Sequence, residues 1–335
     1  GSPVRALCDR GAAYNARNND DMISLLWVVV LLAGVAIIVW GSEQFSKHLS
    51  SASLALGVSS FALALLLAGA EPEELATAIV ASARHAPGIA LGDVIGANVA
   101  ICLVALSVAA WVAPLAFPRR VLLYGWLGIP LGFIGVVCAW DGNVSRIEGG
   151  FLVACYIAYV AGIWIVERHP PALGETGELE KVIKRSGRSA SHLLWVCIGI
   201  AAMAGGAVLV VEAVRHISSL ESMQTRLGLT LVGFATAFEL VALAWSAARR
   251  GISEAVIAGV VGSFVYNVTM TLGAAALVHP LVLARSRLLH FSLVAMLVSL
   301  VVVIAFASPK NILTRLHATA MLILYGAFLW FVLSW

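Results

Sequence analysis

From residue 22 onward the chain is a series of apolar stretches about 20 residues long, separated by short polar stretches. An apolar stretch of that length crosses the hydrocarbon core of a bilayer as an α-helix, whereas half-buried strands would alternate apolar and polar positions. The pattern therefore predicts an all-α polytopic membrane protein. The ten predicted transmembrane helices lie near residues 23–40, 53–70, 90–113, 121–139, 150–167, 191–214, 227–247, 253–278, 287–307 and 314–334.

Composition supports this class and excludes others. Of the 335 residues, 61% are hydrophobic and 12% are charged, against about 25% charged in a soluble domain. The net charge is only +3 and the basic residues are scattered, so no nucleic-acid-binding surface is expected. Four of the five cysteines fall in apolar stretches, which argues against a disulfide scaffold.

The distribution of Lys and Arg predicts the orientation. With both termini outside, twelve basic residues fall in inner loops and six in outer loops after Met22. Residues 168–190 then form a cytoplasmic linker between two five-helix halves, 22–167 and 191–335. Residues 1–21 read as a tag or disordered tail, and no cleavable signal peptide is expected because the first apolar stretch starts late and is long. This layout is typical of the inner (plasma) membrane of a prokaryote.

The two halves resemble each other in sequence. The region 53–113 aligns with 227–280 without a gap, and 24 residues separate Glu73 from Ala97, as they separate Glu239 from Ser263. Five predicted helices lie between the copies, so the second copy enters the membrane in the opposite sense. Inverted repeats of this kind are typical of secondary transporters, whose sites form where the repeats meet near the bilayer midplane.

Acidic residues lie inside these repeats. Glu71, Glu73 and Glu74 flank Pro72 within a stretch, 53–83, that is too long for one straight helix, so a broken helix with carboxylates at the break is expected. Glu239 lies in the middle of a predicted span, where a carboxylate costs at least about 2.5–3.5 kcal/mol. Two structural alternatives remain: some of the first three glutamates lie at a water-exposed helix end, or Glu239 is a protonated packing residue.

Oxygen-bearing side chains accompany the carboxylates, as a hard cation such as Ca²⁺ requires. Unwound backbone near Gly69 and Ala235 would add carbonyl oxygens. Asp93 is a helix cap, a pathway residue or a proton site. Each Ser, Thr or Asn could instead bond a neighbouring helix, and the glycines of the third and eighth segments favour close helix packing. The candidate metal ligands are Glu71, Glu73, Glu74, Thr77, Asn98, Thr236, Glu239, Ser263 and Asn267.

Several motifs resemble those of the cation/calcium exchanger superfamily, most nearly the sodium/calcium exchanger membrane proteins. Residues 85–98, HAPGIALGDVIGAN, are similar to the family stretch GHPDIALGNVIGSN that follows its first acidic motif. In the second half, 227–230 resembles the family's GLT lead-in, and 251–254, Gly262-Ser263 and Asn267 match the rest of the second repeat. The resemblance implies inverted five-helix halves, a midplane ion site, and alternating access by sliding of the first helix of each half.

The chain also departs from the family pattern, whose acidic motif is GTSxPE in both repeats. Residues 69–74 read GAEPEE and 235–239 read ATAFE. Counting from the downstream motif places Glu74 at the family's calcium-binding glutamate, whereas matching the two copies to each other places Glu73 there. Ala97 replaces the usual Ser, and Ile101 replaces an Asn or Asp ligand. The first repeat has therefore lost neutral oxygens and gained carboxylates, which puts ordinary sodium coupling in doubt and suggests a proton as one driving ion.

The sequence thus predicts a cation antiporter, not an enzyme, that exports Ca²⁺ in exchange for Na⁺ or H⁺. Facing carboxylates repel when both are charged and empty, so the site favours a bound divalent ion, two monovalent ions or protons. No cofactor and no nucleotide motif is expected; the partners are inorganic cations and the lipid bilayer. The alternatives are a proton-coupled exchanger of another cation, or a degenerate membrane sensor or scaffold. The oligomeric state is left open.

Overall fold

The computed structural model describes residues 25–49, 71–117, 119–167, 190–250 and 253–334. Nine helices in these ranges are long and apolar enough to cross a membrane, which confirms nine of the ten predicted spans. The tenth, 53–70, lies outside the described residues. In the first half the described helices are Leu25–Leu49 (here called helix 1), α3 (Pro72–Ala83), α4 (Pro87–Ala100), the π-helix η1 (Ile101–Ala105), α5 (Leu106–Val112), α6 (Arg119–Ala139) and α7 (Arg146–Glu167).

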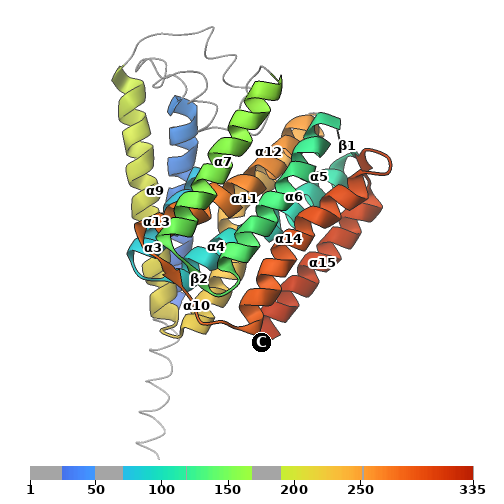
Figure 1. Cartoon of the computed structure of the whole chain (residues 1–335). Coiled ribbons are helices and arrows are strands. Elements are labelled where there is room, and N and C mark those ends of the chain that lie inside the picture. The colour runs from blue at the N-terminus through green and yellow to red at the C-terminus, as the bar shows by residue number, and fades with distance from the viewer. Residues whose placement is uncertain (1–24, 50–70, 118, 168–189, 251–252, 335) are drawn as a thin grey trace, which may run out of the picture.

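The second half repeats this order. It contains α9 (Ala190–Ile217), α10 (Glu221–Leu227), the π-helix η2 (Gly228–Val232), α11 (Gly233–Arg249), α12 (Ser253–Tyr266), the π-helix η3 (Asn267–Thr271), α13 (Leu272–Val278), α14 (Arg287–Ala307) and α15 (Arg315–Ser334). The helices α10, η2 and α11 follow one another directly and form one long span, as do α12, η3 and α13. Helix 1 and α9 stand side by side at one edge of the bundle, and α14 and α15 form the opposite edge (Figure 1).

Irregular elements show how closely the two halves match. The π-helix η3 begins 166 residues after η1, at Asn267 against Ile101. The two-residue strands β1 (Leu115–Ala116) and β3 (Leu281–Val282) are offset by the same amount. In each half the strand follows the helix that carries the π turn. The inverted repeat that the sequence predicts is thus present down to local irregularities of the backbone.

Short strands also connect the halves. β1 pairs antiparallel with β4 (Ile312–Leu313), and β2 (Asn143–Val144) pairs antiparallel with β3. Each pair therefore joins a loop of one half to a loop of the other. These eight residues are the only strand residues within the described ranges, so the fold is all-α in its membrane-spanning part.

Helix 1 is longer than the sequence predicts. Its predicted end near residue 40 is wrong, since the helix continues to Leu49 and carries Ser42 inside the bundle. Polar residues of this last part support the helix: Lys47 donates to Glu43 at 2.5 Å, an i,i+4 pair. Hydropathy marks where apolar residues stop, which is not where helical hydrogen bonding stops.

Helix 1 and α9 contact each other through glycine. A Cβ atom on Gly34 would lie 2.9 Å from the carbonyl oxygen of Gly206, and one on Gly41 would lie 2.8 Å from that of Gly199. Separations below 3.0 Å do not occur for real Cβ atoms, so only glycine allows this approach of two backbones. The first helix of each half is therefore held against its counterpart by backbone contacts.

Glycines also set the contact between α4 and the span that begins with α10. A Cβ on Gly92 would lie 2.9 Å from backbone atoms of Gly228, and one on Gly96 would lie 2.3 Å from the carbonyl oxygen of Leu229. This confirms the predicted packing role of the α4 glycines. Gly259 of α12 differs, because its Cβ would meet only the side chain of Leu240, at an ordinary 3.7 Å.

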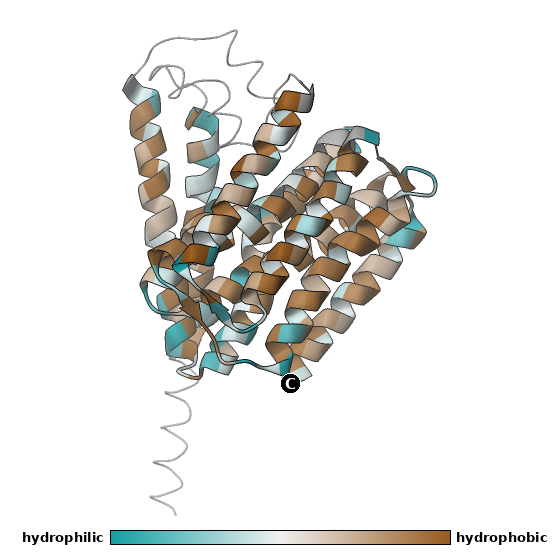
Figure 2. Ribbon diagram, viewed as in Figure 1, coloured by the Kyte–Doolittle hydropathy of each residue, from teal (hydrophilic) through white to brown (hydrophobic). Residues whose placement is uncertain are grey.

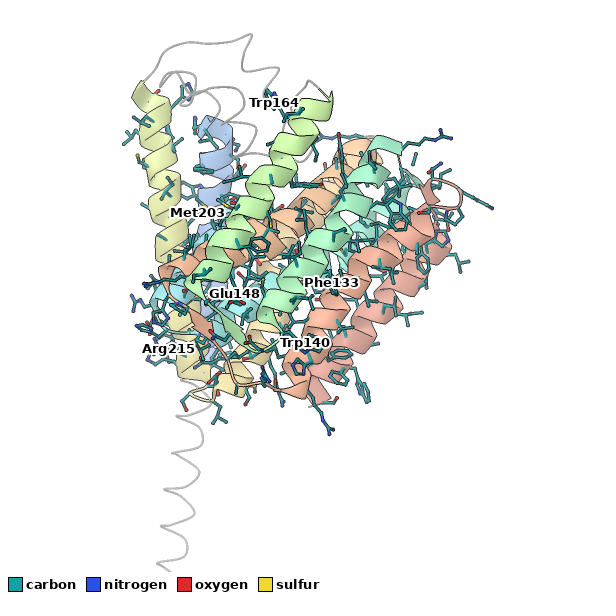
Figure 3. All side chains as sticks on the ribbon, in the orientation of Figure 1. Phe133, Trp140, Glu148, Trp164, Met203 and Arg215 are labelled. Carbon is teal, nitrogen blue, oxygen red and sulfur yellow. The ribbon has the colours of Figure 1, made fainter. Side chains whose placement is uncertain are left out.

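The outer surface matches a bilayer. Figure 2 shows apolar residues along the lengths of the helices and hydrophilic ones mainly near their ends. Trp140 and Trp164 lie toward opposite ends of the bundle, and Phe133 points outward between them (Figure 3). Aromatic residues of this kind mark the two membrane interfaces. The innermost helix is α4, in which every residue from Gly88 to Ala100 is buried.

Candidate functional site

The carboxylates of the first half gather at the start of α3. Pro72 occupies the first helical turn, where its missing N–H costs nothing, and Glu71 precedes it with φ −113° and ψ 82°. The helix therefore begins where the sequence predicts a break. Glu71, Glu73 and Glu74 are 7%, 2% and 0% exposed, so the alternative that they lie at a water-exposed helix end is wrong.

Hydroxyl groups from other helices bond two of these carboxylates. Ser42 of helix 1 donates to Oε2 of Glu73 at 2.6 Å. Ser263 of α12 donates to Oε1 of Glu71. The carboxylates of Glu71 and Glu73 also lie close enough to interact with each other. The start of α3 is thereby connected to helix 1 and to the second half.

Glu74 and Asp93 form the deepest part of the cluster. Both residues are 0% exposed. Glu74 lies beside the amide of Asn267 and near the carboxylates of Glu73 and Asp93. Thr236 of α11 donates to Oδ1 of Asp93 at 3.0 Å. Among the described residues, no group donates a hydrogen bond of good geometry to Oδ2 of Asp93 or to either carboxylate oxygen of Glu74. Buried oxygens in that state favour a bound cation or proton.

Amide side chains form the wall next to Glu74. Asn267 donates to Oδ1 of Asn98 at 3.2 Å, and Asn98 donates to the carbonyl oxygen of Phe264 at 3.3 Å. Thr271 donates to Oδ1 of Asn267 at 3.2 Å. This chain of hydrogen bonds fixes the orientation of both amides. Because Asn267 opens the π-helix η3, an irregular helical turn places it here.

Two predicted ligands are placed differently. Thr77 is buried, but its hydroxyl donates to the carbonyl oxygen of Glu73 in its own helix at 2.8 Å. Glu239 is half-buried, one turn after Thr236 on the same face of α11. The structure thus brings Glu71, Glu73, Glu74 and Asp93 into one cluster with Thr236, Ser263, Asn98 and Asn267, and places Glu239 on the adjoining turn.

The predicted unwound backbone near Ala235 is wrong. Ala235 lies within α11, whose first residue, Gly233, has helical φ −63° and ψ −31°. The irregularity lies earlier, in the π-helix Gly228–Val232, where Thr230 donates to the carbonyl oxygen of Arg226 at 2.7 Å. A π turn adds one residue to a helical turn without breaking the helix. Gly69 lies outside the described residues.

Ser42 and Tyr266 border the cluster although the sequence did not indicate them. Tyr266 is 5% exposed and close enough to Glu71, Glu73 and Glu74 to interact with them electrostatically. Its ring packs edge-on against Tyr156, 5.3 Å between centroids. The only sequence signal for Ser42 is a small polar residue beside Gly41, just beyond the predicted end of the first span.

A protein-family model described as "Sodium/calcium exchanger protein" matches residues 26–165 and 191–334. The match covers both halves and leaves out the predicted linker. The chain belongs to the sodium/calcium exchanger family.

Relatives and a solved structure agree with this membership. The sodium/calcium exchanger MaX1 of Methanosarcina acetivorans is 27% identical over 90% of this chain and 97% of its own length. The inner membrane protein YrbG of Escherichia coli is 23% identical over 76% of this chain and 81% of its own. A structure of the sodium–calcium exchanger NCX_Mj, 22% identical, superposes with a TM-score of 0.60 over 91% of this chain and 97% of its own. The chain therefore has the fold of NCX_Mj.

Within this exchanger fold, the buried carboxylates form a distinct pattern. Three of the four carboxylates accept from three different hydroxyls: Glu71 from Ser263, Glu73 from Ser42, and Asp93 from Thr236. Glu74 has no hydroxyl donor among the described residues. Accordingly, no three Asp, Glu, His or Cys side chains of the described residues are arranged to hold one metal ion together. Binding a cation here requires carboxylates to turn from these hydroxyls toward a shared centre, with Asn and Ser oxygens completing the shell.

Proposed function

We propose that this member of the sodium/calcium exchanger family is a secondary antiporter that exports Ca²⁺ in exchange for Na⁺ or H⁺ by alternating access. The observation that carries the proposal is the carboxylate cluster of α3 and α4, buried where α11, α12 and η3 of the second half meet the first half. Four carboxylates cannot all remain charged in a dry site without cations or protons. The protein would therefore switch the site from one side of the membrane to the other only when cations or protons are bound. Exchange requires this coupling.

Glu74 is our candidate for the central ligand. It is the most deeply buried glutamate of the triplet, its oxygens are available, and it faces Asn267 of the second half. Glu71 and Glu73 are instead engaged by serine hydroxyls. Asn98, Asn267, Ser263 and Thr236 supply neutral oxygens, and Glu239 contributes a carboxylate from the second half. The name of MaX1 indicates Na⁺ and Ca²⁺ for that relative and supports the same pair here.

A proton as the driving ion has specific support. Glu71 and Glu73 are both buried and lie close together, so a proton bound between them would relieve the repulsion of two carboxylates. At the positions that align with Ser263 and Asn267, the first half has Ala97 and Ile101, so it offers Na⁺ fewer neutral oxygens. Exchange of Ca²⁺ for H⁺ is therefore the second candidate, and exchange of H⁺ for another cation is its extension.

The test is Ca²⁺ uptake into proteoliposomes containing the purified full chain. One set of vesicles carries an outward Na⁺ gradient and a second carries a proton gradient without Na⁺. Uptake driven by Na⁺ supports Na⁺/Ca²⁺ exchange. Uptake driven only by the proton gradient supports H⁺/Ca²⁺ exchange, with the buried carboxylates as the groups that bind the proton. No Ca²⁺ movement under either gradient contradicts the proposal and favours another cation, measured next with Sr²⁺ and Mn²⁺, or a non-transporting protein.

The orientation and the domain layout remain predictions. Both termini are proposed to lie outside, with residues 168–190 on the cytoplasmic side of an inner membrane. Labelling of Cys8 by a membrane-impermeant maleimide in intact cells tests the orientation. Labelling is expected without permeabilisation, and protection of Cys8 would reverse the assignment.

A further inference from the structure

A pocket that shares no residue with the carboxylate cluster lies at one end of the bundle. It has a volume of about 320 Å³ and lies between α10 and the segment that leads from β3 into α14. We call it the arginine pocket. Its walls include Arg226, Arg287, Ser222, Ser286, Leu283 and Leu288. Because α10 and α14 each begin a membrane-spanning helix here, the pocket lies at the level of a membrane interface.

The charge in the arginine pocket is positive. Its lining contains two arginines, Arg226 and Arg287, and one carboxylate, that of Glu221, whose Oε1 accepts a hydrogen bond from the backbone N–H of Ala284 at 3.4 Å. Nε of Arg226 is shielded from water, and no group of the described residues accepts a hydrogen bond from it. A buried donor of a charged group without an acceptor is costly. A turn of the Arg226 side chain toward an anion in the pocket would give this donor an acceptor.

Backbone groups add to the same field. α14 is 21 residues long, and Ser286 caps its N-terminus by accepting from the N–H of Leu289 at 3.1 Å. The N–H groups of the first turn, at Arg287 and Leu288, precede the first intrahelical hydrogen bonds of α14. The positive end of the helix dipole therefore reinforces the two arginines in favouring an anion.

Apolar residues beside the pocket indicate that the anion is attached to a hydrocarbon chain. Leu283 and Leu288 form part of the wall. Leu220, Met223 and Val282, on the adjoining segments, are 68%, 43% and 60% exposed. A free inorganic anion gains nothing from such surroundings. A phospholipid places its phosphate among arginines and its acyl chains along exposed apolar side chains.

We propose that the arginine pocket binds the phosphate of an anionic phospholipid, with Arg226 and Arg287 on the phosphate and the acyl chains beside Leu220, Met223 and Val282. Such a lipid would connect the start of α10 to the start of α14. The span that begins with α10 carries Thr236 and Glu239 and is packed on α4 through glycine contacts. A bound headgroup would therefore hold one helix of the cation site at its end.

The experiment measures the thermal unfolding of the full chain in detergent with added short-chain lipids. Phosphatidylglycerol at about 100 times its Kd is expected to raise Tm by about 5 °C. Phosphatidylcholine, whose headgroup carries no net charge, is expected to give less than half of that shift. An equal shift from phosphatidylcholine would overturn the proposal, because acyl chains alone would then account for it. An equal shift from inorganic phosphate would also overturn it, in favour of a free anion.

Variants localise the effect. Arg226→Gln combined with Arg287→Gln is expected to abolish the phosphatidylglycerol shift. Ser222→Asp, an exposed change that leaves both arginines in place, is expected to reduce it by at least half. The matched control is Arg285→Gln, which removes the same charge from the same segment but outside the pocket lining. A shift that persists in Ser222→Asp and in the double variant, or that disappears in Arg285→Gln, contradicts the assignment. The readout needs no ion flux, so it stands apart from the proposed function.

Discussion

The two halves share one helical frame but divide the chemistry of the candidate site unequally. The first half contributes Glu71, Glu73, Glu74 and Asp93, whereas the second contributes mostly hydroxyls and amides. At the positions related by 166 residues, Asp93 corresponds to Gly259, Ala97 to Ser263, and Ile101 to Asn267. The irregular turns η1 and η3 nevertheless coincide. An inverted repeat thus fixes where side chains can meet and leaves each half free to change which ones it supplies.

This asymmetry has an electrostatic consequence. Negative charge concentrates on the side of α3 and α4, and neutral oxygens face it from α11, α12 and η3. A cation at this boundary would be attracted by one half and coordinated by both. Four substitutions test whether the two halves divide the chemistry of the site in this way.

Glu74→Gln removes the carboxylate with the fewest partners. We expect Ca²⁺ uptake to fall by about 100-fold or more, equivalent to about 2.7 kcal/mol of ion binding. The free energy of unfolding is expected to stay the same or rise, because a buried oxygen without a donor is replaced by a neutral amide. Uptake in proteoliposomes and thermal unfolding measure the two effects. A loss of stability together with full uptake would show that Glu74 is structural.

Glu239→Gln tests the carboxylate of the second half. Because Glu239 is half-buried on the turn next to Thr236, we expect uptake to fall by about tenfold, roughly 1.4 kcal/mol. Glu148→Gln is the control, since Glu148 bonds Ser145 at the start of α7, away from the cluster. Full uptake in correctly folded Glu239→Gln would remove this residue from the site and leave the second half with neutral ligands alone.

Gly96→Ala tests the close contact between α4 and η2. The added Cβ would lie 2.3 Å from the carbonyl oxygen of Leu229, so we expect the free energy of unfolding to fall by about 1–3 kcal/mol. Gly259→Ala in the other half meets only a side chain at 3.7 Å and is expected to change it by less than about 0.5 kcal/mol. Denaturant unfolding in detergent compares the two. Equal effects of the two substitutions would show that α4 and η2 can move apart without loss of stability.

Ala97→Ser returns a hydroxyl to the position that corresponds to Ser263. We expect a small change, about two- to threefold, in the dependence of Ca²⁺ uptake on Na⁺, because one added neutral oxygen improves Na⁺ coordination without altering charge. The proton-driven rate measured in the same vesicles is the internal control. An unchanged response to Na⁺ would indicate that the first half plays no part in binding that ion.

Much of the fold follows from local composition. Helices of the required length are dictated by the bilayer, so apolar stretches alone locate nine of the spans. Helix ends are less predictable, as the extension of helix 1 to Leu49 shows. The missed residue Ser42 lies in that extension. Its role depends on a contact with Glu73, 31 residues away, which no local pattern specifies.

The site was predictable as a set of residues but not as an arrangement. Buried carboxylates in inverted repeats are costly enough to mark the region. Which glutamate faces the second half depends on the rotation of α3 about its axis. The two sequence alignments differed by one residue at this point, so they could not decide between Glu73 and Glu74. The π-helix η2 was not predicted either. It holds the irregular turn of this span, and Ala235 lies in the regular helix α11 that follows. Such features arise from packing between helices.

The paired strands have a consequence for a single half. β1 pairs only with β4 and β2 only with β3, so within the described residues no strand has a partner in its own half. A five-helix unit on its own would leave both of its strands with unmatched backbone edges, one at each surface of the bilayer. A second copy inserted upside down would match both edges at once. The fold therefore retains the geometry of a self-complementary dimer of oppositely oriented subunits, now joined in one polypeptide.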